Sequence, residues 1–186
     1  NHLKRIASFK NPEFYAKLGM RLSTYNVPRI ISCAEPSDKY IALPRGCEDA
    51  ITNLLDENHV SYRMNDQTEL GTPISVQFKG ELREEQVAAI KNLIPHNNGV
   101  LYGTTAFGKT VAAIGLIVER KVNTLILVHT KALLDQWKTR LGEYLMIDYK
   151  QEDTPHKRGR KKVFSPFGTL DSKGNNLHSM VDIALM

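Results

Sequence analysis

Residues 103–110, GTTAFGKT, have the residue types and spacing of a phosphate-binding loop. The pattern Gly-x-x-x-x-Gly-Lys-Thr stands between an apolar stretch at 100–102 and an apolar helical pattern that begins at Lys109. Gly103 and Gly108 would let the backbone turn its N–H groups inward toward an anion. The positive end of the following helix would add to that attraction. The sequence therefore predicts a nucleoside triphosphate site.

The motif also assigns roles to side chains. Lys109 would reach the β- and γ-phosphates, and the Thr110 hydroxyl would take a place on Mg²⁺. The loop residues expected to surround the phosphates are Gly103, Thr104, Thr105, Ala106, Phe107 and Gly108. The alternative is a glycine turn that carries Lys-Thr by chance. The flanking strand and helix patterns favour the nucleotide site.

A second anion site is expected at Thr130 and Lys131. They follow a buried apolar stretch, 124–128, and precede a helical pattern that runs to about Tyr144. A helix N-terminus with a hydroxyl and an ammonium group suits a phosphate. The alternative is that Thr130 only caps the helix.

The elements around these loops predict an α/β fold. A strand at 100–102, a helix from Lys109 to about Arg120, a strand at 124–128 and the helix after Thr130 form a parallel, doubly wound pattern. Ligands bind at the carboxyl ends of such strands. We expect a helix at 82–94 before this pattern, a loop at 171–176 and a new apolar element at 180–186.

Residues 1–80 predict a small α+β domain, with the boundary at Lys79–Gly80. Asn11, Pro12 and Glu13 have the order of a helix start. The helices are expected at 11–22 and 48–57, a hairpin is expected from strands 29–34 and 39–43, and further strands are expected at 60–63 and 74–78.

The composition is that of a globular protein with a moderately basic second part. Residues 81–186 carry fifteen Lys and Arg against eleven Asp and Glu, and residues 1–80 carry ten against nine. Cys33 and Cys47 have neither the spacing of a metal site nor that of a disulfide framework. Because no apolar run reaches about 18 residues and no leader is seen, we expect an intracellular protein of the cytoplasm, associated with the nucleoid if bacterial.

In order, the segments LREEQVAAI, GTTAFGKT, LILVHTKALLDQW and VDIALM resemble the first RecA-like domain of superfamily 2 DNA helicases. The likeness is to the XPB-like group and to the related type III restriction helicase subunits, and it covers residues 81–186. Residues 1–80 are more loosely similar to the small domain that precedes the core in XPB-like proteins. The fold implied is a partial RecA-like P-loop sheet preceded by a small α+β domain.

The resemblance implies roles for individual residues. Gln86 matches a glutamine that recognises adenine, and Arg83 would flank the base; the alternative for both is a solvated helix face. An amide can pair with adenine through its donor and its acceptor. Thr130 and Lys131 match a motif that holds the backbone of one DNA strand, although His129 stands where many relatives have Pro. The implied cofactors are ATP and Mg²⁺, and the implied partner is DNA.

A basic run offers further candidates for DNA contact. Five Lys and Arg occur in residues 157–162, and the candidates are Arg158, Arg160, Lys161 and Lys162. Neutralising several phosphates would make binding fall steeply with salt. The alternative is a solvated charged face.

One expected motif is absent from the sequence after Thr110. No Asp-Glu-x-His box occurs, and Asp182 is followed by Ile-Ala. Since the chain begins with Asn1 and ends inside an apolar segment, we expect it to be part of a longer helicase, with a second RecA-like domain in the same chain. We predict that the longer protein hydrolyses ATP and that these residues alone do not.

The sequence leaves two other functions open. One is a P-loop enzyme of another class, such as a small-molecule kinase. The other is a non-catalytic DNA-recognition module formed by residues 1–80, whose basic residues include Arg29, Lys39 and Arg45.

Overall fold

The computed structural model describes residues 2–148, 167–172 and 174–186. The chain forms two compact units, Asn1–Asp66 and Gln67–Met186. The division lies before the expected boundary at Lys79–Gly80, so the expected strand at 74–78 belongs to the second unit and not to the first.

The first unit consists of short elements. They are α1 (His2–Ile6), β1 (Ser8–Lys10), α2 (Pro12–Gly19), β2 (Ile30–Ser32), β3 (Glu35–Pro36), β4 (Ile41–Ala42), the 3-10 turn η1 (Arg45–Cys47) and α3 (Glu48–Glu57). Ala7 and Asn11 are the only buried residues in the described part of this unit. The two expected helices are present, whereas residues 60–63 form no strand.

In the first unit, Asn11 forms the helix cap that the sequence predicted. Its side-chain oxygen accepts a hydrogen bond from the Glu13 N–H at 3.0 Å, and Pro12 occupies the first helical turn. Its amide nitrogen also donates to the Pro28 carbonyl at 2.8 Å. Asn11 therefore caps α2 and ties it to the chain that returns toward β2.

The strand pairing of the first unit differs from the expected hairpin. β2 pairs antiparallel with β1, in a region where the sequence predicted no element. β3 and β4 form a separate short hairpin in which Glu35 pairs with Ala42.

The second unit contains the α/β fold. Its elements are β5 (Val76–Phe78), α4 (Glu84–Leu93), α5 (Lys109–Arg120), β6 (Thr124–Val128), α6 (Lys131–Tyr144), β7 (Leu145–Ile147), β8 (Gly168–Asp171), β9 (Gly174–Asn176) and β10 (Val181–Leu185). The main sheet has the order β6-β10-β8-β9. β10 is parallel to both β6 and β8, and β9 is antiparallel to β8. The expectation of an α/β fold is confirmed, and the sheet is mixed, with three parallel strands and the antiparallel β9.

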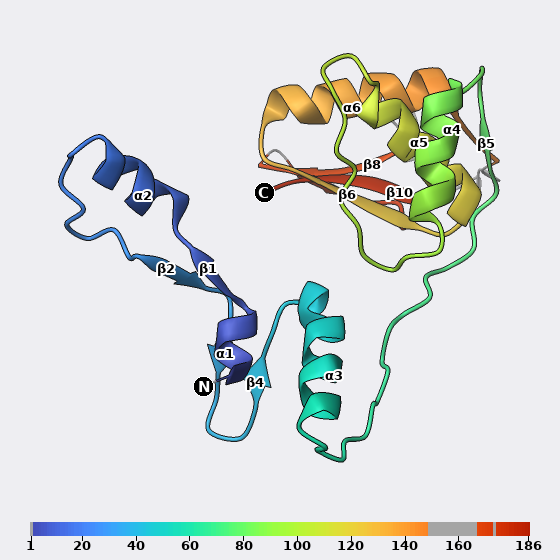
Figure 1. The fold of residues 1–186 in the computed structure, drawn as a ribbon. Helices are drawn as coiled ribbons and strands as arrows, with labels where there is room; N and C mark the ends of the chain where they lie inside the picture. The colour runs from blue at the N-terminus through green and yellow to red at the C-terminus, as the bar shows by residue number, and fades with distance from the viewer. Residues whose placement is uncertain (1, 149–166, 173) are drawn as a thin grey trace. The chain divides into compact units, whose positions relative to one another are not determined.

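Helices α5 and α6 supply much of the core of this unit. Figure 1 shows α6 running along the sheet, and α6 packs against β10, β6 and α5. Ile114 of α5, Leu134 and Leu141 of α6, and Val181 and Ile183 of β10 are each fully buried. Fully burying such a side chain contributes about 1.5–3 kcal/mol to the free energy of unfolding. This packing fixes the N-terminal ends of α5 and α6, which carry the candidate sites.

Strand β5 pairs with β7 and so lies away from the main sheet. The register sets Val76 opposite Ile147 and Phe78 opposite Leu145. The rings of Phe78 and Tyr144 stack with their centroids 5.8 Å apart. The sequence predicted β5 but missed β7, because Leu145–Ile147 continues directly from the apolar pattern of α6.

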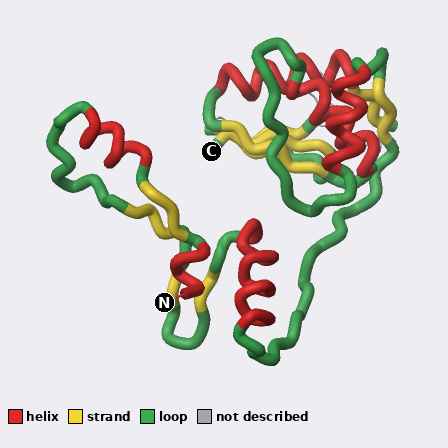
Figure 2. The backbone as a smooth tube through the Cα atoms, in the orientation of Figure 1, coloured by secondary structure: helices red, strands yellow, loops and turns green. Residues whose placement is uncertain are grey.

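The strand expected at 100–102 is wrong in this structure. The chain between α4 and α5 is a loop, as Figure 2 shows, and Val100 and Tyr102 are 92% and 93% exposed. A strand needs a neighbour for its backbone hydrogen bonds. No described segment forms a ladder with residues 100–102. The region expected as a loop at 171–176 instead contains the β8–β9 hairpin.

Candidate nucleotide and phosphate sites

The two glycines of the loop at 103–110 lie in tight surroundings. Gly108 caps α5 in the left-handed region, with φ 80°. A Cβ atom at Gly108 would lie 2.6 Å from the Gln86 amide nitrogen. A Cβ atom at Gly103 would lie 3.0 Å from the Phe107 ring. Both glycines are therefore needed for the close packing of this loop.

Ala106 adopts a conformation that favours glycine. Its φ is 67°, in the left-handed region that costs a residue with a Cβ atom about 1–2 kcal/mol. The turn that contains it is closed by a hydrogen bond from the Phe107 N–H to the Thr104 carbonyl at 3.3 Å. Thr104, Thr105 and Ala106 are exposed. The tip of the loop is accessible to a ligand.

Lys109 contacts the loop that precedes it. Its ammonium group donates to the Gly103 carbonyl at 2.9 Å and to the Thr104 carbonyl at 3.1 Å. These neutral carbonyl oxygens are the hydrogen-bond acceptors for the ammonium group. Thr110 is half-buried one residue later, in the first turn of α5. The structure thus brings both candidate catalytic residues to the start of this helix.

Gln86 and Arg83 lie against the same loop. Gln86 is 3% exposed, and its amide nitrogen donates to the Phe107 carbonyl at 2.9 Å. Its amide oxygen accepts from the Arg83 N–H at 3.1 Å. The Arg83 guanidinium donates to the carbonyls of Ala106 and Phe107 and pairs with Glu85 at 2.9 Å. Thus α4 braces the loop, and the solvated-face alternative does not hold for Gln86.

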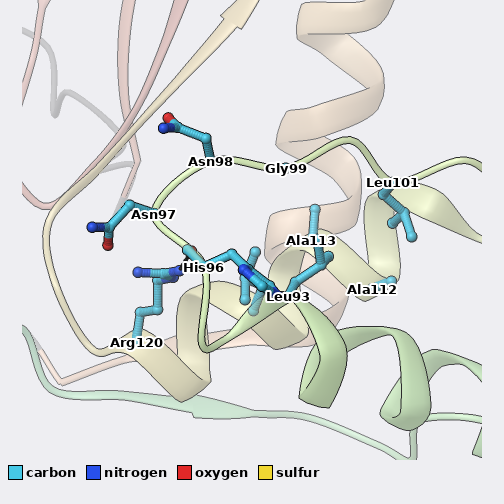
Figure 3. Close-up of a pocket in the computed structure, with 10 residues that line it drawn as sticks. Leu93, His96, Asn97, Asn98, Gly99, Leu101, Ala112, Ala113 and Arg120 are labelled. Carbon is cyan, nitrogen blue, oxygen red and sulfur yellow. Dashed lines mark hydrogen bonds between the residues drawn. The ribbon is translucent and has the colours of Figure 1, made fainter. Parts of the chain in front are cut away.

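A cavity of about 300 Å³ lies beside this loop but does not include it. Figure 3 shows that the loop after α4, with His96, Asn97 and Asn98, forms one wall, and that Arg120 points toward this wall. Arg120 donates to the His96 carbonyl at 2.7 Å. None of residues 103–110 lines this cavity.

The second predicted site lies at the start of α6, beyond the carboxyl end of β6. The Thr130 hydroxyl accepts from the Leu133 N–H at 3.3 Å, so it caps the helix. The ammonium group of Lys131 lies 3.1 Å from Asp135 and 3.4 Å from Asp171. Its hydrogen bond to Asp135 is the main cause that raises the pKa of Lys131 above its ordinary value, and Asp171 adds to that effect.

The two acidic partners of Lys131 were not among the predicted site residues. Asp135 could have been found, because positions i and i+4 share one helix face. Asp171 is 40 residues away from Lys131 in sequence. The two residues come together because β10 pairs with both β6 and β8. The other predicted DNA contacts, Arg158, Arg160, Lys161 and Lys162, lie outside the described residues.

A large part of the chain matches a protein family. Residues 79–180, more than half of the chain, match the family described as "Type III restriction enzyme, res subunit". The chain belongs to this family. The match includes the loop at 103–110, both Gln86 and Arg83, and the start of α6.

Individual relatives are similar over part of the chain. The DNA 3'-5' translocase XPB2 of Sulfurisphaera tokodaii is 38% identical over 39% of this chain and 17% of its own length. A putative helicase of Invertebrate iridescent virus 6 is 33% identical over 47% of this chain and 23% of its own length. A putative DNA 3'-5' helicase, Rad25, of Haloarcula marismortui is 33% identical over 54% and 17%, respectively. These matches confirm the resemblance to XPB-like superfamily 2 helicases, and the chain spans less than a quarter of each of these relatives.

The described residues contain neither a cluster of metal-binding side chains nor a helix that could span a membrane. In that part of the chain, no three His, Cys, Asp or Glu side chains gather as a metal site would require. No helix there combines the length and apolar character that a membrane span needs.

Proposed function

We propose that this chain is the ATP-binding part of an ATP-dependent DNA helicase or translocase. Its family membership and the names of its relatives support this function. The observation that carries the proposal is the loop at 103–110, held by Gln86 and Arg83 at the N-terminus of α5. We further propose a RecA-like fold for the second unit, a DNA-recognition role for the first, and a cytoplasmic protein that is associated with the nucleoid if bacterial.

The loop residues fit a polyphosphate. Gly108 approaches Gln86 so closely that no Cβ atom fits, and the first N–H groups of α5 have no partner within the helix. A bound ATP would supply the phosphates that these donors and the Lys109 ammonium group recognise. For Lys109 to bind a phosphate oxygen, it has to leave the carbonyls of Gly103 and Thr104. It exchanges neutral acceptors for a charged one, which strengthens the hydrogen bond.

Gln86 would have a double role in this site. Its amide oxygen and nitrogen both have protein partners in the structure. To read adenine through both atoms, the side chain has to give up the Arg83 and Phe107 contacts. We propose that base recognition by Gln86 is therefore coupled to the conformation of the loop.

Mg²⁺ would find one side-chain ligand in the loop, the Thr110 hydroxyl. Mg²⁺ keeps several waters and also takes phosphate oxygens, so one hydroxyl suffices for binding with ATP. Hydrolysis also needs a group that orients the attacking water. We propose that this group and a second RecA-like domain lie elsewhere in the longer protein.

DNA binding is proposed at the start of α6. Thr130 and Lys131 would hold backbone phosphates of one strand, with Arg158, Arg160, Lys161 and Lys162 as further candidates. The coupling of ATP binding to movement on DNA would then pass through the two RecA-like domains closing on each other.

The ATP site is tested by calorimetric titration of ATP with Mg²⁺ into the chain and into its Lys109→Ala variant. Loss of one charge-assisted hydrogen bond costs about 1.5–3 kcal/mol, so affinity should fall about 10- to 100-fold. Lys91→Ala, an exposed lysine on α4, is the control. Equal ATP affinity for the Lys109→Ala variant and the unchanged chain would overturn the proposal, and phosphate transfer to nucleosides would favour a kinase.

One observation supports the alternative of a DNA-recognition module in the first unit. Arg29 donates to the Tyr15 hydroxyl at 3.1 Å, and the Lys10 ammonium group lies 5.8 Å from the Tyr15 ring centroid. A ring flanked by two cations suits a nucleotide, which offers a base to stack and a phosphate to pair. If Arg29→Ala and Lys10→Ala abolish DNA binding while Lys131→Ala does not, this unit is the DNA-binding part.

A further inference from the structure

The carboxyl ends of three parallel strands bring Lys131 and Asp171 together. In the sheet, Leu185 of β10 pairs with Val128 of β6, and Ala184 pairs with Leu170 of β8. Figure 1 shows β6, β10 and β8 side by side. Lys131 follows β6 and Asp171 ends β8, so the Lys131 side chain spans the end of β10 to make its 3.4 Å contact.

The two carboxylates around Lys131 differ in their surroundings. Asp135 lies on α6, and its side chain is 59% exposed. Asp171 lies in a paired strand, and its side chain is only 14% exposed. Asp135 lies on the same helix as Lys131, whereas Asp171 is held in the sheet. Together they hold the ammonium group of Lys131, whose side chain is 48% exposed, at one place on the sheet edge.

We propose that Asp135 and Asp171 form a carboxylate clamp that a DNA phosphate has to displace from Lys131. The inference rests on the proposed DNA contact at Lys131 and adds the residues that set its strength. A phosphate that approaches Lys131 meets two negative charges within 3.4 Å of the same ammonium group. Coulomb repulsion from the clamp opposes the phosphate, and the existing ion pairs must open. The clamp therefore weakens the binding of the DNA backbone.

The size of the effect follows from the exposure of the pairs. Exposed ion pairs are weak, so releasing Lys131 from one of them should raise DNA affinity about two- to fivefold at low salt. Such a modest gain needs a control for net charge. Glu143→Gln supplies it, because Glu143 lies on the same helix, pairs with Arg140 at 2.8 Å and changes the charge by the same amount.

The experiment measures binding of a fluorescein-labelled oligothymidylate by anisotropy across a salt series, using the whole chain. Asp171→Asn and Asp135→Asn should each bind more tightly than Glu143→Gln, with a steeper dependence on salt. In a Lys131→Met background, which keeps the aliphatic stem, the gains should vanish. Circular dichroism checks the fold; Asp135→Asn, on an exposed helix face, decides the result if Asp171→Asn does not fold.

Each outcome bears on one of the two proposals. If the chain binds DNA in a Lys131-dependent manner but neither asparagine variant exceeds Glu143→Gln, the clamp is wrong and the DNA contact stands. Gains that persist without Lys131 would also overturn the clamp. If neither the unchanged chain nor any variant binds DNA, the proposed DNA site fails and the clamp fails with it. Release of the oligonucleotide by inorganic phosphate at constant ionic strength would show a general anion site and overturn the clamp's role toward DNA.

Discussion

The amide nitrogen of Gln86 donates to the carbonyl oxygen of Phe107 at 2.9 Å, and this hydrogen bond links α4 to the phosphate-binding loop. The amide oxygen of the same side chain accepts from the Arg83 N–H at the start of α4. One buried side chain thus satisfies a helix terminus and a loop at once. The shape of the loop depends on a residue 21 positions away from Phe107.

Replacing Gln86 should therefore weaken the fold as well as the nucleotide site. In Gln86→Ala, the Arg83 N–H loses its partner and the Phe107 carbonyl keeps only the Arg83 guanidinium. An unsatisfied buried polar group costs about 1–3 kcal/mol. We expect the free energy of unfolding in urea to fall by about that amount. Asn92→Ala, at an exposed position of α4, is the matched control. Equal stability of the two variants would show that Gln86 does not brace the loop.

Gly108→Ala and Gly142→Ala should change stability in opposite directions. Gly108 has φ 80° and no room for a Cβ atom beside Gln86, so alanine should cost about 2–4 kcal/mol through strain and the displaced amide. Gly142 lies inside α6 with open space around it, so alanine should add about 0.5–1 kcal/mol. Urea unfolding of both variants checks the signs. A neutral Gly108→Ala would mean that the loop has another conformation in solution.

Ala106→Gly tests the left-handed turn at the tip of the loop. Glycine removes the strain of φ 67°, about 1–2 kcal/mol, but adds about 0.5–1 kcal/mol of backbone entropy to the unfolded chain. The net change should be between zero and about 1.5 kcal/mol of added stability. Ala88→Gly, exposed on α4, should instead lose about 1 kcal/mol. The same loss at Ala106 would contradict the turn.

Local signals in the sequence predicted the helices that carry the sites. Thr130 caps α6 as its hydroxyl and position indicated, and Asn11 caps α2 with Pro12 in the first turn. A cap joins residues two or three positions apart, so it can be predicted from neighbouring residues. The start of α5 at Lys109 was predicted from the Gly-Lys-Thr motif, and Gly108 precedes it without a side-chain cap.

Partners distant in sequence could not be predicted in this way. Strand β2 pairs with β1 rather than with the next apolar stretch, and β5 pairs with β7 across the second unit. Apolar alternation shows that a segment can form a strand, but it does not specify the neighbour. The stretch at 100–102 has the right residues for a strand and forms none, because no described strand lies beside it. The contact of Lys131 with Asp171 was missed for the same reason.

The raised pKa of Lys131 predicts how its contribution to stability depends on pH. Its ion pairs with Asp135 and Asp171 favour the charged form in the folded state, so the folded pKa exceeds the ordinary value of 10.5. The stabilisation is then fully present below that value and is lost as the pH rises through the folded pKa. Lys131→Met should be less stable than the unchanged chain near neutral pH, and the difference should shrink in strongly alkaline solution. Lys131→Arg keeps its charge there, so its stability relative to the methionine variant should persist. Urea unfolding of the three proteins, near neutral pH and in strongly alkaline solution, measures the differences. If the stability difference between the unchanged chain and Lys131→Met is the same under both conditions, the ion pairs contribute nothing in solution.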